Sequence, residues 1–448
     1  MEDKEFVANV KRILKECIEN LDSVKWMFVM NPEKDFTRDR KISFEKFINI
    51  CLQMEGGTVQ NELLKYFNFS DDTPTKSAFC QQRAKVHPEA LEFLFRMFTE
   101  ILLDLGAPKT FRGFRLLACD GSDINIPYNP MDAESFHQCA DKRGYNQLHL
   151  NAFFDILNGI YVDCILESDR KSHERYAFNT MIDRLGLSLK IPAIIMADRG
   201  YEAYNTFAHL LKSGQKFLIR LKDENSNGII STWDFAPHRD ENNEFDCEIE
   251  TILTWKQTNN IKENWQSYTY VAKEKFDFYE NDNPFFPMAL RIVCINVAPD
   301  TYEYLATNLD CEEFPLSVLK ELYHLRWGEE TSFRDLKYTI DILHFHARKR
   351  AFVEQEAWAR LVVYNFCEAI IRYIALPEQK DVSRKRKHDQ KINFAVGACI
   401  CKNYLKRNDN DINVCRLIQR FLIPIRPGRS SPREIKPQSA KYFVYRAS

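Results

Sequence analysis

Four polar side chains recur at helical spacing in the run ELYHLRWGEETSFRDLKYTI, residues 321–340. In an α-helix, residues three, four and seven positions apart share one side. Apolar residues at similar spacing line the neighbouring side and can pack this helix onto a core. A helix anchored in this way would hold a phenol, two cations and a carboxylate in one row, which suits binding of a metal ion and of phosphate oxygens. The four residues are Tyr323, Arg326, Glu330 and Lys337.

Two aspartates each end a run of strand-like apolar residues. Asp120 lies in LLACDGSDI, and Asp198 lies in PAIIMADRGY. For Glu330 alone, a solvated helix surface is the simpler interpretation, because most charged helix positions do nothing more. Two carboxylates at strand ends that face a carboxylate on a packed helix form a cage of oxygens, however. Hard divalent cations such as Mg²⁺ or Mn²⁺ prefer such ligands.

The pattern Tyr-x2-Arg-x3-Glu-x6-Lys, with the preceding Asp-Gly-Ser and Asp-Arg-Gly-Tyr segments, resembles transposases of the insertion-sequence-4 family. That family belongs to a larger class that carries two aspartates and a glutamate on a ribonuclease H-like fold. The resemblance covers about residues 110–372 and, more loosely, both ends of the chain. It implies a catalytic, metal-binding set of Asp120, Asp198 and Glu330, with Mg²⁺ as cofactor and Mn²⁺ as substitute. It also implies that Tyr323, Arg326 and Lys337 bind DNA phosphate.

Two-metal chemistry would account for this set, because two divalent ions about 4 Å apart can activate water, polarise phosphorus and stabilise the leaving oxygen. The family implies that Asp120 bridges the ions while Asp198 and Glu330 each complete one shell. Strand transfer would use the same site, with a deoxyribose hydroxyl in place of water. Tyr323 as a covalent nucleophile is disfavoured, since tyrosine recombinases need an arginine and histidine cluster.

Neighbouring residues compete for these roles. Asp123 lies three residues beyond Asp120 and stays an alternative acid. Glu329 is turned about 100° from the polar stripe, so we expect it to point away from the cage.

Further DNA contacts are expected from basic and aromatic residues near the motifs. Arg199 either touches DNA or helps to cap the next helix, and Trp327 either stacks on a base or, more often for such a residue, packs under its neighbours. The basic stretch after the motif helix suits a path for the DNA backbone, with salt-dependent affinity. These candidates are Arg199, Trp327, Arg348, Lys349 and Arg350.

Composition is that of a globular protein, with 45% hydrophobic and 28% charged residues in 448. No apolar run reaches the length of a membrane span, and the acidic, amphipathic start is not a signal peptide, so we expect a cytoplasmic, nucleoid-associated bacterial protein that does not bind membranes. The 13 cysteines are scattered and odd in number. This pattern favours reduced, buried thiols over disulfides or a zinc site.

Charge is segregated although the formal net charge is only −2. From residue 412 to the last residue there are eight basic residues and one acidic residue, and residues 384–387 are four consecutive cations. Residues 240–250 instead hold six acids and no base. A local basic surface matters more for nucleic-acid binding than the total charge does.

Three regions are expected. Residues 1–108 repeat apolar residues at helical spacing, and a short helix after Thr75 or Ser77 carries Gln81, Gln82, Arg83 and Lys85, which suits either major-groove reading or a simple helical interaction domain. By resemblance, this region binds the DNA of the element's ends. Residues 377–448 form a basic C-terminal region for DNA contact or dimerisation.

Between them, residues 109–376 form an α/β catalytic domain. The pattern predicts three strands, a helix, a strand, a helix and a strand, and the resemblance assigns this order to a ribonuclease H-like fold. A β-rich insertion is expected at about residues 223–308, then one helix at about 315–340 and a long amphipathic helix at 353–376.

The sequence therefore predicts a DNA transposase that acts on double-stranded element ends and target DNA, as a homodimer on paired ends. The alternatives are a metal-dependent nuclease of the same fold that does not join strands, and a DNA-binding protein that has lost catalysis.

Overall fold

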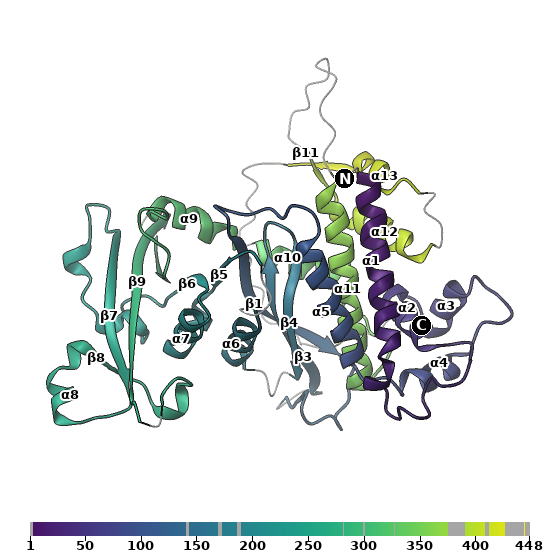
Figure 1. The fold of residues 1–448 in the computed structure, drawn as a ribbon, viewed down its shortest axis with the longest axis horizontal. Helices are drawn as coiled ribbons and strands as arrows, with labels where there is room; N and C mark the ends of the chain where they lie inside the picture. The colour runs from purple at the N-terminus through teal and green to yellow at the C-terminus, as the bar shows by residue number, and fades with distance from the viewer. Residues whose placement is uncertain are drawn as a thin grey trace, which may run out of the picture.

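The computed structural model describes residues 3–139, 143–168, 173–185, 190–280, 282–298, 301–326, 328–374, 390–407, 412–425 and 443. A β-sheet extends from the middle of the molecule to one end, and helices from both ends of the chain gather at the other (Figure 1). The α/β class expected from the sequence is confirmed. No helix in the described ranges is both long enough and apolar enough to cross a membrane.

Five strands form the centre of the sheet in the order β4-β3-β1-β5-β6. The first three in sequence pair antiparallel, whereas β1, β5 and β6 pair in parallel. Helices α6 (Glu174–Leu185) and α7 (Tyr204–Lys212) connect β4 to β5 and β5 to β6. This is the strand and helix order that the sequence predicted, and it is the order of a ribonuclease H-like sheet. The bounds are β1 Arg115–Ile126, β3 Tyr145–Asp155, β4 Ile160–Ser168, β5 Ala193–Ala197 and β6 Lys216–Arg220.

The predicted β-rich insertion continues this same sheet. Strand β10 pairs antiparallel with β6, and β9, β7 and β8 follow outward. Two long strands were visible as alternating apolar segments, but β10 was not predicted, and only three residues of the expected strand at 267–276 are extended as β8. The bounds are β7 Phe245–Thr254, β8 Tyr268–Tyr270, β9 Phe285–Ala298 and β10 Thr301–Thr307. A short strand β2 (Phe136–His137) pairs with β3 at the opposite edge.

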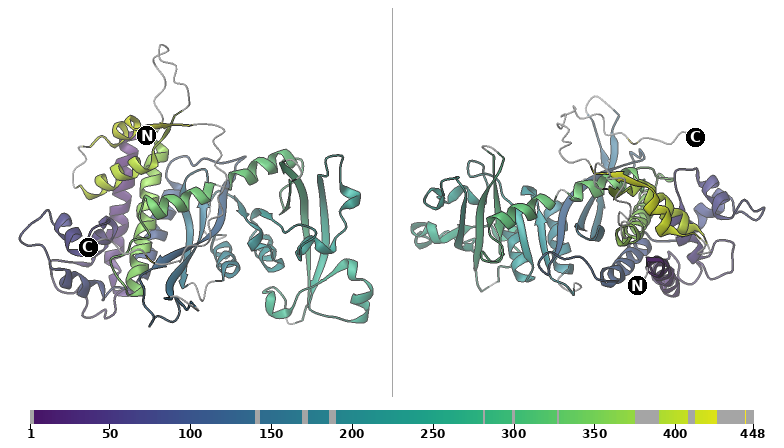
Figure 2. Two further views of the ribbon diagram at one scale, coloured as in Figure 1. Left: turned by 180° about the vertical axis from the view of Figure 1, so that it is seen from behind. Right: turned by 90° about the horizontal axis from the view of Figure 1, so that it is seen from above.

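Alternation along β1 divides the core between the two faces of the sheet. Leu117 and Cys119 pack with α6 and α7 on one face. Leu116 and Ala118 pack on the other face, which carries α10 (Gly328–Tyr338) and α11 (Arg350–Tyr373), seen from behind in Figure 2. Because successive side chains of a strand point to opposite sides, a single strand supplies both cores.

The motif helix predicted at 315–340 is two helices, α9 (Leu316–Leu325) and α10. Arg326 is the C-cap residue of α9, and the Glu329 amide bonds to the Arg326 carbonyl, three residues back, as in a 3₁₀ turn. The four motif residues are therefore divided between two helices: Tyr323 and Arg326 at the end of α9, Glu330 and Lys337 on α10. The single continuous stripe expected from the spacing is wrong.

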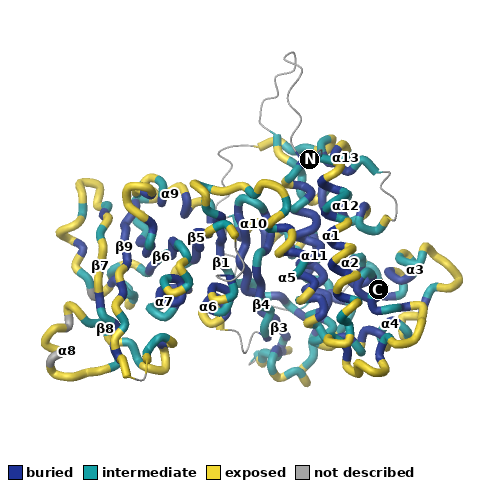
Figure 3. The backbone as a smooth tube through the Cα atoms, in the orientation of Figure 1, coloured by how far each residue is buried: buried dark blue, intermediate teal, exposed yellow. Residues whose placement is uncertain are grey.

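Helix α11 is buried on nearly all sides, as Figure 3 shows, rather than amphipathic as expected. It packs against α1 (Asp3–Ser23) and α5 (Glu89–Asp104) on one side and β4 on the other. Its polar residues are paired inside: Asn365 Oδ1 accepts a hydrogen bond from the Tyr161 amide at 2.9 Å, and Glu356 accepts one from Arg83 at 2.8 Å. Internal partners allow polar residues on an otherwise apolar surface.

The remaining helices flank α1 and α11. The Thr75 side chain caps α4 by accepting a hydrogen bond from the Ala78 amide, so the short helix expected after Thr75 or Ser77 begins after Thr75. Gln82 and Arg83 of that helix are buried, so these two side chains cannot contact DNA. Gln81 is exposed and Lys85 is half-buried, and DNA reading by this helix stays a prediction. The thirteen cysteines, all in the described ranges, are free thiols. The bounds are α2 Phe44–Gln53, α3 Val59–Tyr66, α4 Lys76–Arg83, α12 Phe394–Lys406 and α13 Val414–Arg420, with a small β11–β12 pair, Gln390–Ile392 and Leu422–Pro424.

Candidate active site

Strands β1 and β5 place two aspartates on adjacent strands. The two strands pair in parallel, with Cys119 opposite Ala197. Asp120 and Asp198 are the residues that follow these two on the adjacent strands. Neighbouring strands are about 4.8 Å apart. The extended backbone continues through Asp198, so alternation directs both aspartates to the sheet face that α10 covers.

Each aspartate is oriented by a backbone amide. Asp120 Oδ1 accepts a hydrogen bond from the Gly121 amide at 2.8 Å. Asp198 Oδ1 accepts one from the Gly200 amide at 2.7 Å and caps the 3₁₀ turn Arg199–Tyr201. The second oxygen of each carboxyl is not used in these bonds.

Glu330 approaches this pair from α10. It is exposed and lies in the first turn of that helix. Burial, together with the nearby charges of Asp198 and Glu330, raises the pKa of Asp120 to about 6, although the Gly121 amide and Arg326 act to lower it. Asp198 and Glu330, both singled out from the sequence, therefore lie close enough to act electrostatically on Asp120.

The donor atoms suit a hard divalent cation, because all of them are carboxylate oxygens. The like charges around Asp120 also favour a positive ion at this place. Within the described ranges, no three His, Cys, Asp or Glu side chains converge closely enough to form a metal-binding group. The donors are thus near one another without standing at coordination distances.

A fourth carboxyl, Glu329, lies beneath them. It is fully buried, and burial followed by the charge of Asp120 raises its pKa well above the ordinary value. Neither side-chain oxygen makes a hydrogen bond of normal geometry within the described ranges. The expectation that Glu329 points away from the site is wrong, because the 3₁₀ turn before α10 changes the angle at which this residue leaves the helix.

Two cations flank the acids. The buried guanidinium of Arg326 interacts with the charges of Asp120 and Asp198 and lies 5.5 Å from the ring centre of Tyr323. Burial lowers the pKa of Lys337, while the charges of Asp123 and Asp120 act to raise it. Tyr323 is itself buried, and burial raises the pKa of its phenol. Both cations are therefore within electrostatic range of the strand-end acids.

Sequence reasoning missed a network on the opposite face of β1. His149 Nδ1 lies 2.9 Å from Asp123 Oδ1, and Nε2 lies 3.3 Å from Glu174 Oε1. Burial favours the neutral ring, yet the bonds and charges of Asp123 and Glu174 raise the pKa of His149 to about 9. Asp123, the alternative acid, is thus paired with His149.

The network also explains a glycine of the Asp-Gly-Ser segment. A β-carbon at Gly121 would stand 2.5 Å from His149 Nε2. A glycine inside a strand often marks such a close approach, and this was the signal available in the sequence.

The other candidate DNA contacts differ in their surroundings. Arg199, Arg348 and Lys349 are exposed. Arg350 forms ion pairs with Asp132 at 3.1 Å and with Glu134, so part of its charge is already balanced. Trp327, residues 384–387 and all of the basic residues after 425 lie outside the described ranges.

Comparison with known proteins adds an independent finding. A family model described as "Transposase DDE domain" matches residues 112–366, which include both aspartates and all four motif residues. Among solved structures, that of the piggyBac transposase synaptic complex with hairpin DNA is similar over 87% of this chain and 77% of that chain, at 9% identity and a TM-score of 0.43. No curated protein matches. With more than half of its length matched, the chain belongs to the family of transposase DDE domains.

Proposed function

We propose that the chain is a DNA transposase of the insertion-sequence-4 type, which cuts the ends of its own element and joins the 3′ hydroxyls to target DNA. The observation that carries the proposal is the parallel pairing of β1 with β5, which sets Asp120 and Asp198 on adjacent strands under α10. Glu330 completes the set, because its charge acts on Asp120.

Asp120, Asp198 and Glu330 would hold the cofactor, which we propose to be Mg²⁺ with Mn²⁺ as a substitute. A bound divalent cation supplies Lewis acidity, which activates water or a hydroxyl and stabilises the leaving oxygen. The chain's own contribution is to orient the carboxyls, through the amides of Gly121 and Gly200.

Arg326 and Lys337 are suited to binding the phosphate that is cut. A guanidinium can donate two parallel hydrogen bonds to phosphate oxygens, and an ammonium supplies a point charge. Both charges act on Asp120, so a phosphate held between them would lie near the acids. Tyr323, whose ring centre is 5.5 Å from the Arg326 guanidinium, would support Arg326 and donate its phenol hydrogen to the same phosphate, as the resemblance implies.

The roles proposed for the three regions of the chain and for its partners follow from this site. We propose residues 1–108 as a helical DNA-binding domain, 109–376 as the catalytic domain with its insertion at about 223–308, and 377–448 as a basic region for DNA contact or dimerisation. Element ends and target DNA would be the partners, and two copies of the chain would pair two ends. A cytoplasmic location with access to the nucleoid agrees with these partners.

The test uses the DNA that flanks the coding region. Inverted repeats found there are made as labelled duplexes and incubated with the protein, a plasmid target and Mg²⁺ or Mn²⁺. We expect cut ends and joined products from the wild type, and neither from Asp198→Asn, which should still bind the repeats. Cleavage without joining would support the nuclease instead, and binding without any nicking would support a catalytically silent protein.

A further inference from the structure

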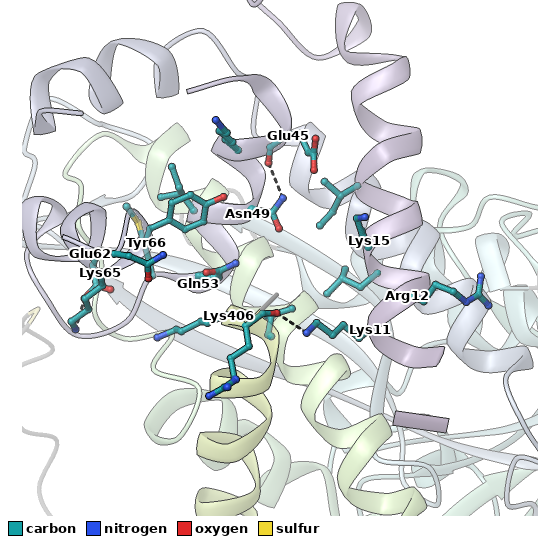
Figure 4. A pocket seen from close by; sticks show the side chains of 18 of the residues that line it. Lys11, Arg12, Lys15, Glu45, Asn49, Gln53, Glu62, Lys65, Tyr66 and Lys406 are labelled. Atoms are coloured by element: carbon teal, nitrogen blue, oxygen red, sulfur yellow. Dashed lines mark hydrogen bonds and ion pairs between the residues drawn. The ribbon is translucent and has the colours of Figure 1, made fainter. Parts of the chain in front are cut away.

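A groove of about 790 Å³ lies between α1, α2, α3 and the end of α12 (Figure 4). It is on the far side of α11 from the sheet, because α11 contacts α1 and α2 on one side and β4 on the other. Much of its positive charge is balanced inside the protein, and the contacts that bear on the two aspartates lie instead where α6 begins. The ion pairs of the groove are Arg12 with Glu16, Lys15 with Glu19, Lys65 with Glu62 and Lys406 with Glu55.

Pairing within the sheet does not fix the segment that carries Asp198. The parallel pairing of β1 with β5 ends at Cys119 and Ala197, and Asp198 is the first residue beyond β5. Asp120 instead lies within β1 and is paired on its other side with Ala152 of β3. A cation shared by two carboxyls requires a fixed separation between them. Contacts outside the sheet must therefore hold the turn after β5.

The first turn of α6 supplies such contacts to the turns after both aspartates. Arg175 Nε donates a hydrogen bond to the Gly200 carbonyl at 3.1 Å. A β-carbon at Gly121 would stand 3.1 Å from Glu174 Oε1, and one at Gly200 would stand 4.0 Å from Glu174 Oε2. One carboxyl group thus lies beside both glycines, whose amides orient the two aspartates.

His149 of β3 holds Glu174 in this place. The ring is nearly fully buried, with Nδ1 2.9 Å from Asp123 Oδ1 and Nε2 3.3 Å from Glu174 Oε1. Burial lowers the pKa of His149, but the bonds and charges of the two acids raise it to about 9, so the ring is a cation at neutral pH. Without this cation, Asp123 and Glu174 would repel each other, and the start of α6 would move away from β1.

We propose that His149 is a positioning residue: by holding the carboxyl of Glu174 beside the two glycine turns, it sets the separation of Asp120 and Asp198. The proposal rests on the proposed function, which makes the two aspartates ligands of a divalent cation. His149 lies on the face of β1 opposite to Asp120, so it acts through the glycine turns and does not touch the cation. Loss of a group that orients metal ligands typically weakens metal binding or activity by about ten- to hundredfold.

A second buried histidine provides a matched control. His209 of α7 is also held between two acids, with Nδ1 2.8 Å from Asp183 Oδ1 and Nε2 3.0 Å from Asp277 Oδ2. Its exposed fraction is 8%, against 6% for His149. Its two acids belong to the last turn of α6 and to the insertion. A His209 variant should therefore lose similar packing and charge pairing while leaving the two aspartates in place.

The experiment compares His149→Gln with His209→Gln in the full-length protein. Binding of Mn²⁺ to the DNA-free protein is followed by the electron paramagnetic resonance signal of the free ion. Binding of a labelled duplex that carries the element's end is measured by fluorescence anisotropy in EDTA, and its cleavage is measured over a range of Mn²⁺ concentrations. Glu174→Gln, with Asp277→Asn as its control, is a milder pair, because both side chains are partly exposed. Urea unfolding establishes that each pair is folded and loses similar stability.

We expect His149→Gln to weaken Mn²⁺ binding by about ten- to hundredfold and to slow cleavage at low Mn²⁺, with partial recovery at high Mn²⁺. Glu174→Gln should change in the same direction. Affinity for the duplex should be unchanged, and both control variants should keep wild-type Mn²⁺ binding and cleavage.

Equal effects of the two histidine variants, or unchanged Mn²⁺ binding in His149→Gln, would overturn the proposal. A wild type that binds Mn²⁺ but does not cut DNA would instead refute the proposed function. The Mn²⁺ titration would then still decide the role of His149, because it does not depend on cleavage.

Discussion

Replacing Asp120 with Asn should make the metal-free protein more stable while abolishing cleavage. The pKa of Asp120 is raised from 3.8 to about 6 in the folded chain, and at about 1.4 kcal/mol per pKa unit this difference corresponds to about 3 kcal/mol. Below the unfolded pKa the carboxyl is protonated in both states and costs nothing. Between pH 3.8 and 6 the carboxyl ionises in the unfolded chain but stays protonated in the folded one, so stability is lost across this range and does not fall further above it.

The assay is urea unfolding of wild type and Asp120→Asn in EDTA. The variant should gain up to about 3 kcal/mol at neutral pH and less than about 1 kcal/mol at pH 4. Saturating Mg²⁺ should then stabilise the wild type, by about 2.7 kcal/mol at a hundredfold excess over Kd, and leave the variant unchanged. Asp71→Asn, at an exposed position, is the control and should alter neither curve. An equal gain at both pH values, or a variant that responds to Mg²⁺ as the wild type does, would refute the reasoning.

Three further experiments, with four test substitutions and one control, address other parts of the structure. Arg83→Ala should cost about 3–5 kcal/mol in urea unfolding, because it removes the guanidinium from the buried ion pair with Glu356, while Lys76→Ala on the same helix should cost under about 1 kcal/mol. Gly121→Ala should destabilise the protein by about 1–3 kcal/mol and impair cleavage, since the new β-carbon displaces His149; unimpaired cleavage would show that the network does not support the site. Glu330→Gln should abolish cleavage with DNA binding retained, whereas Glu329→Gln should raise stability at neutral pH but not at pH 4, because its folded pKa is raised. Loss of metal binding in the Glu329 variant alone would reverse these two roles.

Sequence patterns predicted the features that depend on interactions between residues close together in the chain. The two aspartates follow strands because short apolar runs with β-branched residues form buried strands, and Thr75 caps α4 because its hydroxyl can accept from an amide three residues on. The adjacency of Asp120 and Asp198 was not visible, since it depends on the pairing of β1 with β5, about 80 residues apart in sequence.

The predictions for α11 and β10 were wrong or absent because both elements depend on contacts with residues far away in the sequence. The sequence predicts an amphipathic helix at 353–376, and nothing nearby in sequence reveals that Arg83 and Tyr161 bind Gln355, Glu356 and Asn365 inside the core. Strand β10 was missed for a similar reason. It is stabilised by pairing with β6 and β9, which no local window contains.

Glu329 and Glu330 differ in their surroundings because of a short turn that the sequence does not reveal. Glu329 and Glu330 have the same chemistry and follow one another, yet one is fully buried and the other exposed. In a continuous helix from Tyr323, the rotation of about 100° per residue would fix the directions of both glutamate side chains. The 3₁₀ turn at Arg326 resets that rotation, so the start of α10 turns Glu329 down towards the backbone of Asp120 and Glu330 out towards solvent. In the proposed function the exposed carboxylate of Glu330 is the one that would reach a cation and a DNA end, whereas burial favours the neutral form of Glu329. This difference in burial agrees with the proposed place of Glu330 in the acid set, which the motif spacing and the family resemblance had implied.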